Sequence, residues 1–135
     1  TITFYLDFIS PYAYLAFERL PQAMMGLNII VADTDAQARR LFTSMQQRFL
    51  GMQRGERGPL PPPVESMDGL WSEGERLGVE RMLAESIVGS PVTVRAGLRE
   101  TLARTGADEL ILTCDLFEHS ARLRSYEIAS QAASR

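Results

Sequence analysis

The segment from Met24 to Ala32 is almost continuously apolar, and an amphipathic stretch follows it directly. A short apolar run of this kind is typical of a strand buried on both faces of a parallel sheet. The next stretch opens with Thr34 and Gln37, which have the spacing of a helix-capping pair. Apolar residues then recur at intervals of three and four along one face, namely Ala38, Leu41, Phe42, Met45, Phe49 and Met52. This pattern predicts a strand followed by a helix from Asp35 to about Met52.

A glycine- and proline-rich stretch lies between Gly51 and Gly69, and it predicts a loop because this composition interrupts both helices and strands. Its proline run, Pro59 to Pro63, lies close to Arg57. Such a run is either a rigid surface connection or a polyproline ligand for a partner, and we favour the connection. A second capping pair, Ser72 and Glu75, predicts a helix that continues to about Ser86.

The C-terminal third predicts a helix, a strand and a second helix. Pro91 to Thr105 is preceded by Ser90 and followed by Gly106, which are favourable residues at the two ends of a helix. Glu109 to Thr113 predicts a short strand. The last helix is expected from about Ser120 to Ala132.

The N-terminus predicts one more strand and helix, with the strand at Thr1 to Leu6 and the helix from Ser10-Pro11 to Leu20. Strand-helix units therefore occur three times, near the N-terminus, after Met24 and after Glu109. This order predicts an α/β fold with parallel strands, and we expect residues 1–135 to form one compact domain. Three strands cannot close an eight-stranded barrel, so the chain is either a small open sheet or a piece of something larger.

Composition excludes several kinds of function. The formal net charge is −3, so no broad basic field exists to bind nucleic acid or a membrane surface. All 14 basic residues are Arg, which excludes a Schiff-base lysine and a Walker-type phosphate lysine. The single cysteine, Cys114, cannot form an intrachain disulfide. With neither a membrane-spanning run nor a signal peptide in view, we expect a cytoplasmic location.

The stretch GLNIIVADTDAQARRL, from Gly26 to Leu41, resembles the seventh strand and helix of luciferase-like flavin-dependent monooxygenases. The resemblance runs from about Met24 to Arg135. Its other segments follow in family order at Gly58 to Val64, Val88 to Leu98, Thr105 to Leu110 and His119 to Glu127.

This resemblance implies the last part of a (β/α)8 barrel whose active site lies at the carboxyl ends of its strands. It also implies FMN as the cofactor. The early strands, which carry most of the flavin contacts in that family, have no counterpart here. A companion chain, or further copies of this chain, would have to supply the missing strands.

The first 20 or so residues resemble a different family. Phe4 to Ala16 is similar to the first strand and helix of 2-hydroxychromene-2-carboxylate isomerases, which are thioredoxin-like and glutathione-dependent enzymes of the DsbA family. The resemblance implies that Ser10 holds the glutathione thiol at a helix N-terminus. The alternative, which we favour, is that Ser10 only caps the helix. The seam between the two resemblances lies near Pro21-Gln22-Ala23.

His119 is the only histidine, so it is the candidate for any histidine-dependent general base. The competing interpretation, which we favour, is a residue at a helix start that bonds to the local backbone. Cys114 follows the same strand and is either a nucleophile or, as we favour, a small buried hydrophobic residue.

Acidic residues follow two of the predicted strands, at Asp33, Asp35, Asp115 and Glu118. They could be imagined as ligands of a hard metal ion, but a helix start explains Asp33 and Asp35 better, and we predict no metal site. The helix start at Gly89-Ser90-Pro91 could receive a phosphate through its free N–H groups. No basic residue lies beside it in sequence, which weakens that hypothesis.

Three functions follow from these observations. The first is a fragment of a luciferase-like flavin-dependent monooxygenase that is not catalytic alone. The second is a non-catalytic fusion remnant that self-associates through open strand edges and apolar faces. The third is a glutathione-dependent isomerase that uses Ser10.

Overall fold

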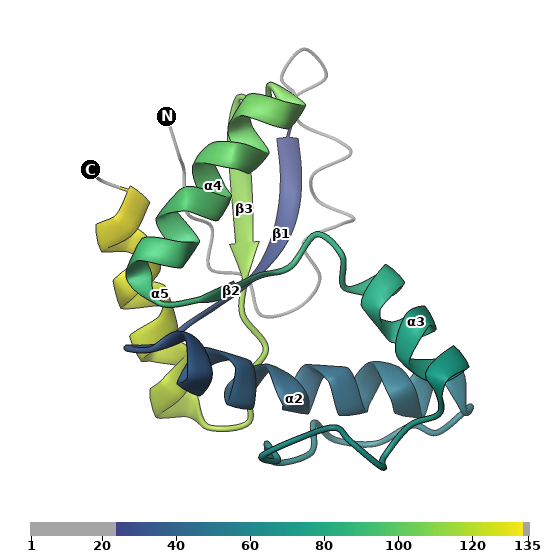
Figure 1. Ribbon diagram of the computed structural model, residues 1–135. Helices are drawn as coiled ribbons and strands as arrows, with labels where there is room; N and C mark the ends of the chain where they lie inside the picture. The colour runs from purple at the N-terminus through teal and green to yellow at the C-terminus, as the bar shows by residue number, and fades with distance from the viewer. Residues whose placement is uncertain (1–23, 134–135) are drawn as a thin grey trace.

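A computed structural model describes residues 24–133, so the predicted strand at Thr1 to Leu6, the following helix and Ser10 lie outside the described residues. The described chain contains a three-stranded parallel sheet in the order β2-β1-β3 (Figure 1). Its strands are β1, Met24–Val31; β2, Ile87–Gly89; and β3, Glu109–Thr113. The predicted α/β class with parallel strands is confirmed.

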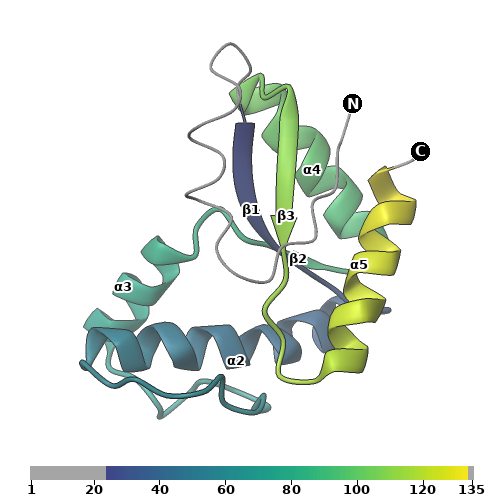
Figure 2. The same cartoon turned by 180° about the vertical axis from the view of Figure 1, so that it is seen from behind.

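Residues 24–133 form four helices: α2, Asp35–Gln53; α3, Glu73–Met82; α4, Pro91–Thr105; and α5, His119–Ala133. Helices α4 and α5 pack on the same face of the sheet. Helix α2 lies across the carboxyl ends of the strands, and α3 packs beside its far end (Figure 2). Of the helices that the structure describes, none is long and apolar enough to cross a membrane.

Both faces of β1 are buried, which explains its continuous apolar run. Every second side chain from Leu27 to Val31 points toward α4 and α5. There Leu27, Ile29 and Val31 form one core with Leu98 and Ile128. Ile30 points to the opposite face, where it forms a second core with Cys114 and Leu116. Leu41 and Phe42 of α2 cover that second core. The period of two along a strand therefore places successive side chains in different cores.

The predicted helix ends agree with the structure wherever a cap marks them. Thr34 accepts a hydrogen bond from the Gln37 N–H at 3.2 Å, and α2 begins at Asp35. Gly106 ends α4 in the left-handed conformation, with φ of 63°. One predicted core position on α2 is wrong: Met52 is 54% exposed, whereas Gln53 and Arg54, which follow it, reach α3.

The helix predicted from Ser72 to about Ser86 is too long. It ends at Met82, and the next residues turn into β2, a strand that the sequence did not indicate. Only Ile87, Val88 and Gly89 pair with β1, in register with Ile29 to Val31. Three residues are too few for hydrophobic periodicity to separate a strand from the end of a helix.

Residues 35–86 form a long excursion between β1 and β2 that contains a core of its own. Met45, Leu50, Met67, Val79 and Leu83 form this core between α2 and α3. The proline run lies along α2, where Gln47 donates a hydrogen bond to the Pro62 carbonyl at 2.9 Å. Thr43 accepts the Val64 N–H at the same distance. These contacts agree with the favoured interpretation of a surface connection.

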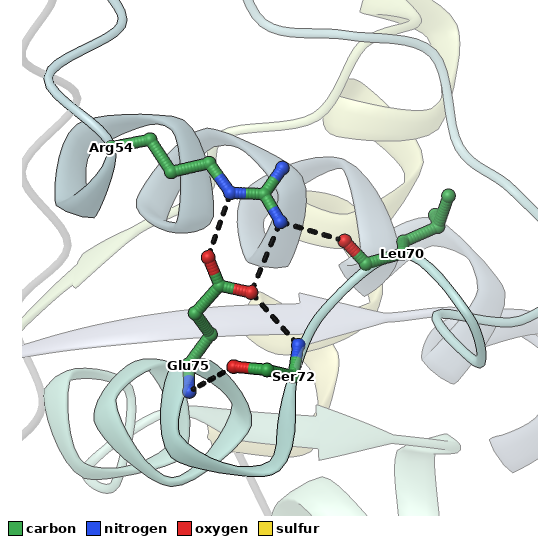
Figure 3. A network of polar contacts seen from close by, with 4 residues as sticks. All are labelled: Arg54, Leu70, Ser72 and Glu75. Atoms are coloured by element: carbon green, nitrogen blue, oxygen red, sulfur yellow. Dashed lines mark hydrogen bonds and ion pairs between the residues drawn. The ribbon is translucent and has the colours of Figure 1, made fainter.

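An arginine clamps the two helices of the excursion together (Figure 3). The guanidinium of Arg54, which follows α2, donates to both carboxylate oxygens of Glu75, at 2.8 and 3.0 Å. It also donates to the Leu70 carbonyl at 3.0 Å. Glu75 in turn accepts the Ser72 N–H, which completes the predicted capping box. Hydrogen bonding to Arg54 is the main reason that the pKa of Glu75 falls to about 2.

Candidate functional site

The candidate site is the edge of the sheet where the carboxyl ends of β1, β2 and β3 meet. Parallel sheets bind their ligands at this edge, because loops that follow different strands converge there. Asp33 and Asp35 follow β1, Ser90 follows β2, and Cys114 and Asp115 follow β3. Most of the candidate residues in the described part of the chain therefore lie on this edge.

Asp35 connects the start of α2 with the start of α4. Its carboxylate accepts the Ser90 N–H at 2.6 Å and the Thr93 hydroxyl at 2.8 Å. The Ser90 N–H, followed by the Thr93 hydroxyl, lowers the pKa of Asp35 below its usual value. Gly89 is required beside this contact, because a Cβ there would lie 2.5 Å from the Thr93 methyl carbon and 2.8 Å from an Asp35 oxygen.

This arrangement corrects the phosphate hypothesis for Gly89-Ser90-Pro91. The N-terminus of α4 does bind an anion, as free N–H groups and the helix dipole favour. That anion is the carboxylate of Asp35, which lies 55 residues earlier in the sequence. A phosphate at the same place would meet a negative charge rather than a free site.

Two other acidic residues of this edge, Asp33 and Asp115, pair separately with arginines. Asp33 contacts Arg124 of α5 at 3.3 Å, and Asp115 contacts Arg48 of α2 at 3.6 Å. Both pairs are solvent-exposed and therefore contribute little to stability. Across residues 24–133, no group of three or more His, Cys, Asp or Glu side chains is arranged to hold a metal ion.

Cys114 is a buried residue beneath this edge. Burial raises the pKa of its thiol to about 11, so little thiolate is present near neutral pH. Its backbone N–H donates to the Tyr126 hydroxyl at 2.9 Å, and the neighbouring Ser125 accepts the Val31 N–H at 2.9 Å. Helix α5 thus binds the ends of two strands, and the interpretation of Cys114 as a small buried hydrophobic residue is confirmed.

His119 is exposed as the first residue of α5. Its Nδ1 lies 2.7 Å from the Arg122 guanidinium, which donates to it. In a typical histidine general base, one ring nitrogen takes the proton and the other is hydrogen-bonded to a carboxylate. In the described residues, the His119 ring is bonded to a cation, Arg122, instead. The favoured interpretation is right about the helix start, but the ring contacts the Arg122 side chain rather than the local backbone.

Two open hollows border the site. One, of about 900 Å³, lies between α2 and the Ser86–Val88 segment and is lined by Arg39, Phe42 and Met67, among others. The second, of about 780 Å³, lies between β2 and α4. Ser86 lines both, and its hydroxyl oxygen is buried without a hydrogen-bond partner. Sequence reasoning missed both hollows, because it missed β2.

The predicted phosphate site at the start of α4 is not free for a flavin. A flavin mononucleotide needs a site for its phosphate, and the α4 N-terminus, the predicted candidate, already binds the Asp35 carboxylate. Between β1 and β3, the Thr113 hydroxyl lies 2.8 Å from Asn28 Oδ1, so these two polar side chains also bond to each other.

Comparison with known proteins identifies relatives by sequence and by structure. No established protein-family profile matches the chain. The chain is 49% identical over 109 residues to a luciferase-like monooxygenase of Escherichia coli (strain K12), a match that covers 81% of this chain and 32% of the relative. It is 46% identical over 108 residues to the protein YvbT of Bacillus subtilis (strain 168), with coverage of 80% and 32%.

Among solved structures, the crystal structure of apo-MsnO8 superposes with a TM-score of 0.66 at 27% identity. It covers 84% of this chain and 35% of that one. The chain thus spans about a third of the length of the relatives that it matches. The resemblance to luciferase-like monooxygenases is confirmed, and its extent fits a C-terminal segment.

Proposed function

We propose that this chain is a C-terminal segment of a luciferase-like, flavin-dependent monooxygenase and is not catalytic by itself. The observation that carries the proposal is the short open sheet, in which three parallel strands correspond to a third of the relatives' length. In an eight-stranded barrel the active site is assembled from loops that follow strands of the whole barrel. A third of the barrel therefore supplies part of an active site.

The chemistry of the described residues supports the same proposal. Their strongest polar contacts, Asp35 with Ser90 and Arg54 with Glu75, join elements of the chain to one another. Cys114 is protonated near neutral pH and His119 bonds to a cation. None of these described groups is arranged as an activated nucleophile or a carboxylate-oriented base. The segment's contribution is to shape and close one side of a site.

A hybrid protein tests this proposal. Residues 24–135 of this chain replace the matched 109-residue segment of the Escherichia coli relative. Flavin fluorescence then measures the binding of oxidised and reduced FMN to the hybrid and to the unmodified relative. We expect both to bind FMN with similar affinity. Two results would contradict the proposal. In the first, the unmodified relative binds FMN and the hybrid folds but does not bind FMN. In the second, the unmodified relative binds no flavin.

Ser10 and His119 remain predictions within this framework. Ser10 lies outside the described residues. If the chain is a glutathione-dependent isomerase that uses Ser10, it should have thiol-dependent isomerase activity, and a Ser10→Ala variant should lose that activity. His119 is testable in the hybrid, where a His119→Ala variant would lose turnover but keep its affinity for FMN if the imidazole transfers protons.

A further inference from the structure

The start of α4 carries no acidic residue of its own. An acidic side chain or a bound anion stabilises a helix N-terminus, because the free N–H groups there carry a partial positive charge. The first turn of α4, Pro91 to Val94, contains no Asp or Glu. The negative charge at this position comes from Asp35, the first residue of α2, which lies 55 residues away from Ser90 in sequence. A residue of another element therefore takes the place of the missing anion.

Positive groups of both helices converge on the Asp35 carboxylate. It lies in the first turn of α2, where the N–H groups of that helix also favour a negative charge. On α4 it accepts the Ser90 N–H at 2.6 Å and the Thr93 hydroxyl at 2.8 Å. The charge of Arg39, one turn further along α2, adds to these two hydrogen bonds in lowering the pKa of Asp35. The basic residue that the sequence lacks beside Ser90 is thus supplied by α2.

This position can be reached from solvent. Asp35 is half-buried, and Thr93 and Arg39 are exposed. An anion from solution would therefore find two helix N-termini and a guanidinium there if the carboxylate were absent. With the carboxylate in place, a free anion competes against a group of the same charge that the chain already holds beside the N–H groups. Such a tethered group has the advantage of a high effective concentration.

We infer that Asp35 is a specificity-determining residue of the carboxyl edge, where it acts as a built-in anion between the N-termini of α2 and α4. It closes this end of the site to phosphates and carboxylates and leaves it to neutral groups of a ligand. Any cofactor phosphate that binds along this edge therefore binds away from α4. The inference goes beyond the proposed function, because it concerns the charge that the site selects and holds for the chain without a flavin.

Thermal unfolding of the full chain at pH 7 tests this inference, in inorganic phosphate and in sodium chloride of equal ionic strength. Asp35→Ala empties the position. We expect phosphate to raise the midpoint of this variant above its value in chloride by about 2–4 °C more than in the wild type. Asp35→Asn fills the same space with an amide and should behave like the wild type. Asp33→Ala, the matched control, removes a neighbouring negative charge without opening the start of α4.

A second variant and a second measurement locate the effect. Asp35→Ser, which also removes the carboxylate, repeats the unfolding test, and NMR follows the Ser90 amide while phosphate is added. A gain in the two opened variants only, with a saturable shift of the Ser90 amide resonance, supports the inference. The absence of a gain in both overturns it, as does an equal gain in the wild type or in Asp33→Ala. Because no flavin enters these measurements, a failure here is distinct from a failure of the proposed function.

Discussion

The Asp35 carboxylate accepts the backbone N–H of Ser90 at 2.6 Å, and so joins the first residue of α2 to the residue that caps α4. The two residues follow the carboxyl ends of neighbouring strands. An internal carboxylate thus neutralises the helix N-terminus that an external anion could otherwise use. The contact fixes where the long excursion leaves the sheet and where it returns.

Removal of the Asp35 carboxylate should therefore destabilise the chain. Asp35→Ala is expected to lower the thermal midpoint at pH 7 by several degrees, and Asp35→Asn by less, because an amide oxygen still accepts the Ser90 N–H. Asp33→Ala, which breaks one exposed pair with Arg124, is the control and should change the midpoint little. Equal effects of the Asp33 and Asp35 variants would contradict this account.

The same contact should depend on pH. Hydrogen bonding to Ser90 lowers the folded-state pKa of Asp35 below its usual value of 3.8. The stabilisation is therefore fully present above 3.8 and is lost as the pH falls through the lower, folded-state pKa. Chemical unfolding of the wild type and Asp35→Asn between pH 7 and pH 2 should show curves that converge at the acid end.

Ser125 should contribute more to stability than its size suggests. It is fully buried and accepts the Val31 N–H, so Ser125→Ala leaves a buried backbone donor unpaired. The free energy of unfolding should fall by about 1–3 kcal/mol. Ser120→Ala, an exposed change on the same helix, serves as the control in urea denaturation and should be close to neutral. A neutral Ser125→Ala would mean that the bond to Val31 contributes little.

Two glycines should respond in opposite directions to alanine. At Gly89 the new methyl group would overlap Thr93 and Asp35, and we expect a loss of about 1–3 kcal/mol in unfolding free energy. At Gly74, in the exposed first turn of α3, nothing lies within 4 Å of the new Cβ. Gly74→Ala should therefore gain about 0.5–1 kcal/mol through helix propensity. Urea denaturation of both variants measures the change in the free energy of unfolding. An unchanged value for Gly89→Ala would contradict the close packing of Gly89 against Thr93 and Asp35.

The contact between Arg54 and Glu75 should depend on the protonation of the Glu75 carboxyl group. The pKa of Glu75 is about 2, below its usual 4.5. The contact therefore stabilises the α2–α3 pair fully above pH 4.5, and this stabilisation is lost as the pH falls through about 2. In Arg54→Ala the pKa of Glu75 should rise toward its usual value. Carboxyl NMR titration measures this shift, with Arg104→Ala as the control because Arg104 pairs with Glu85 instead.

Local features of the fold were predictable from sequence, and contacts between distant residues were not. The capping residues Thr34, Ser72 and Gly106 marked helix ends because each satisfies backbone groups a few residues away. Strand β2 was missed because its three residues acquire their conformation from pairing with β1. The site followed the same rule. The anion-binding tendency at Ser90 was visible, but Asp35 as its partner depends on the whole excursion between them.

The most direct test of the central claim is a titration of the purified chain with oxidised and reduced FMN, followed by flavin fluorescence and by the unfolding midpoint. A segment that holds no flavin alone should give no saturable fluorescence change and no shift of the midpoint, since a ligand that binds only the folded state must raise it. Saturable binding with a raised midpoint would contradict the account and would show that this chain builds a flavin site of its own.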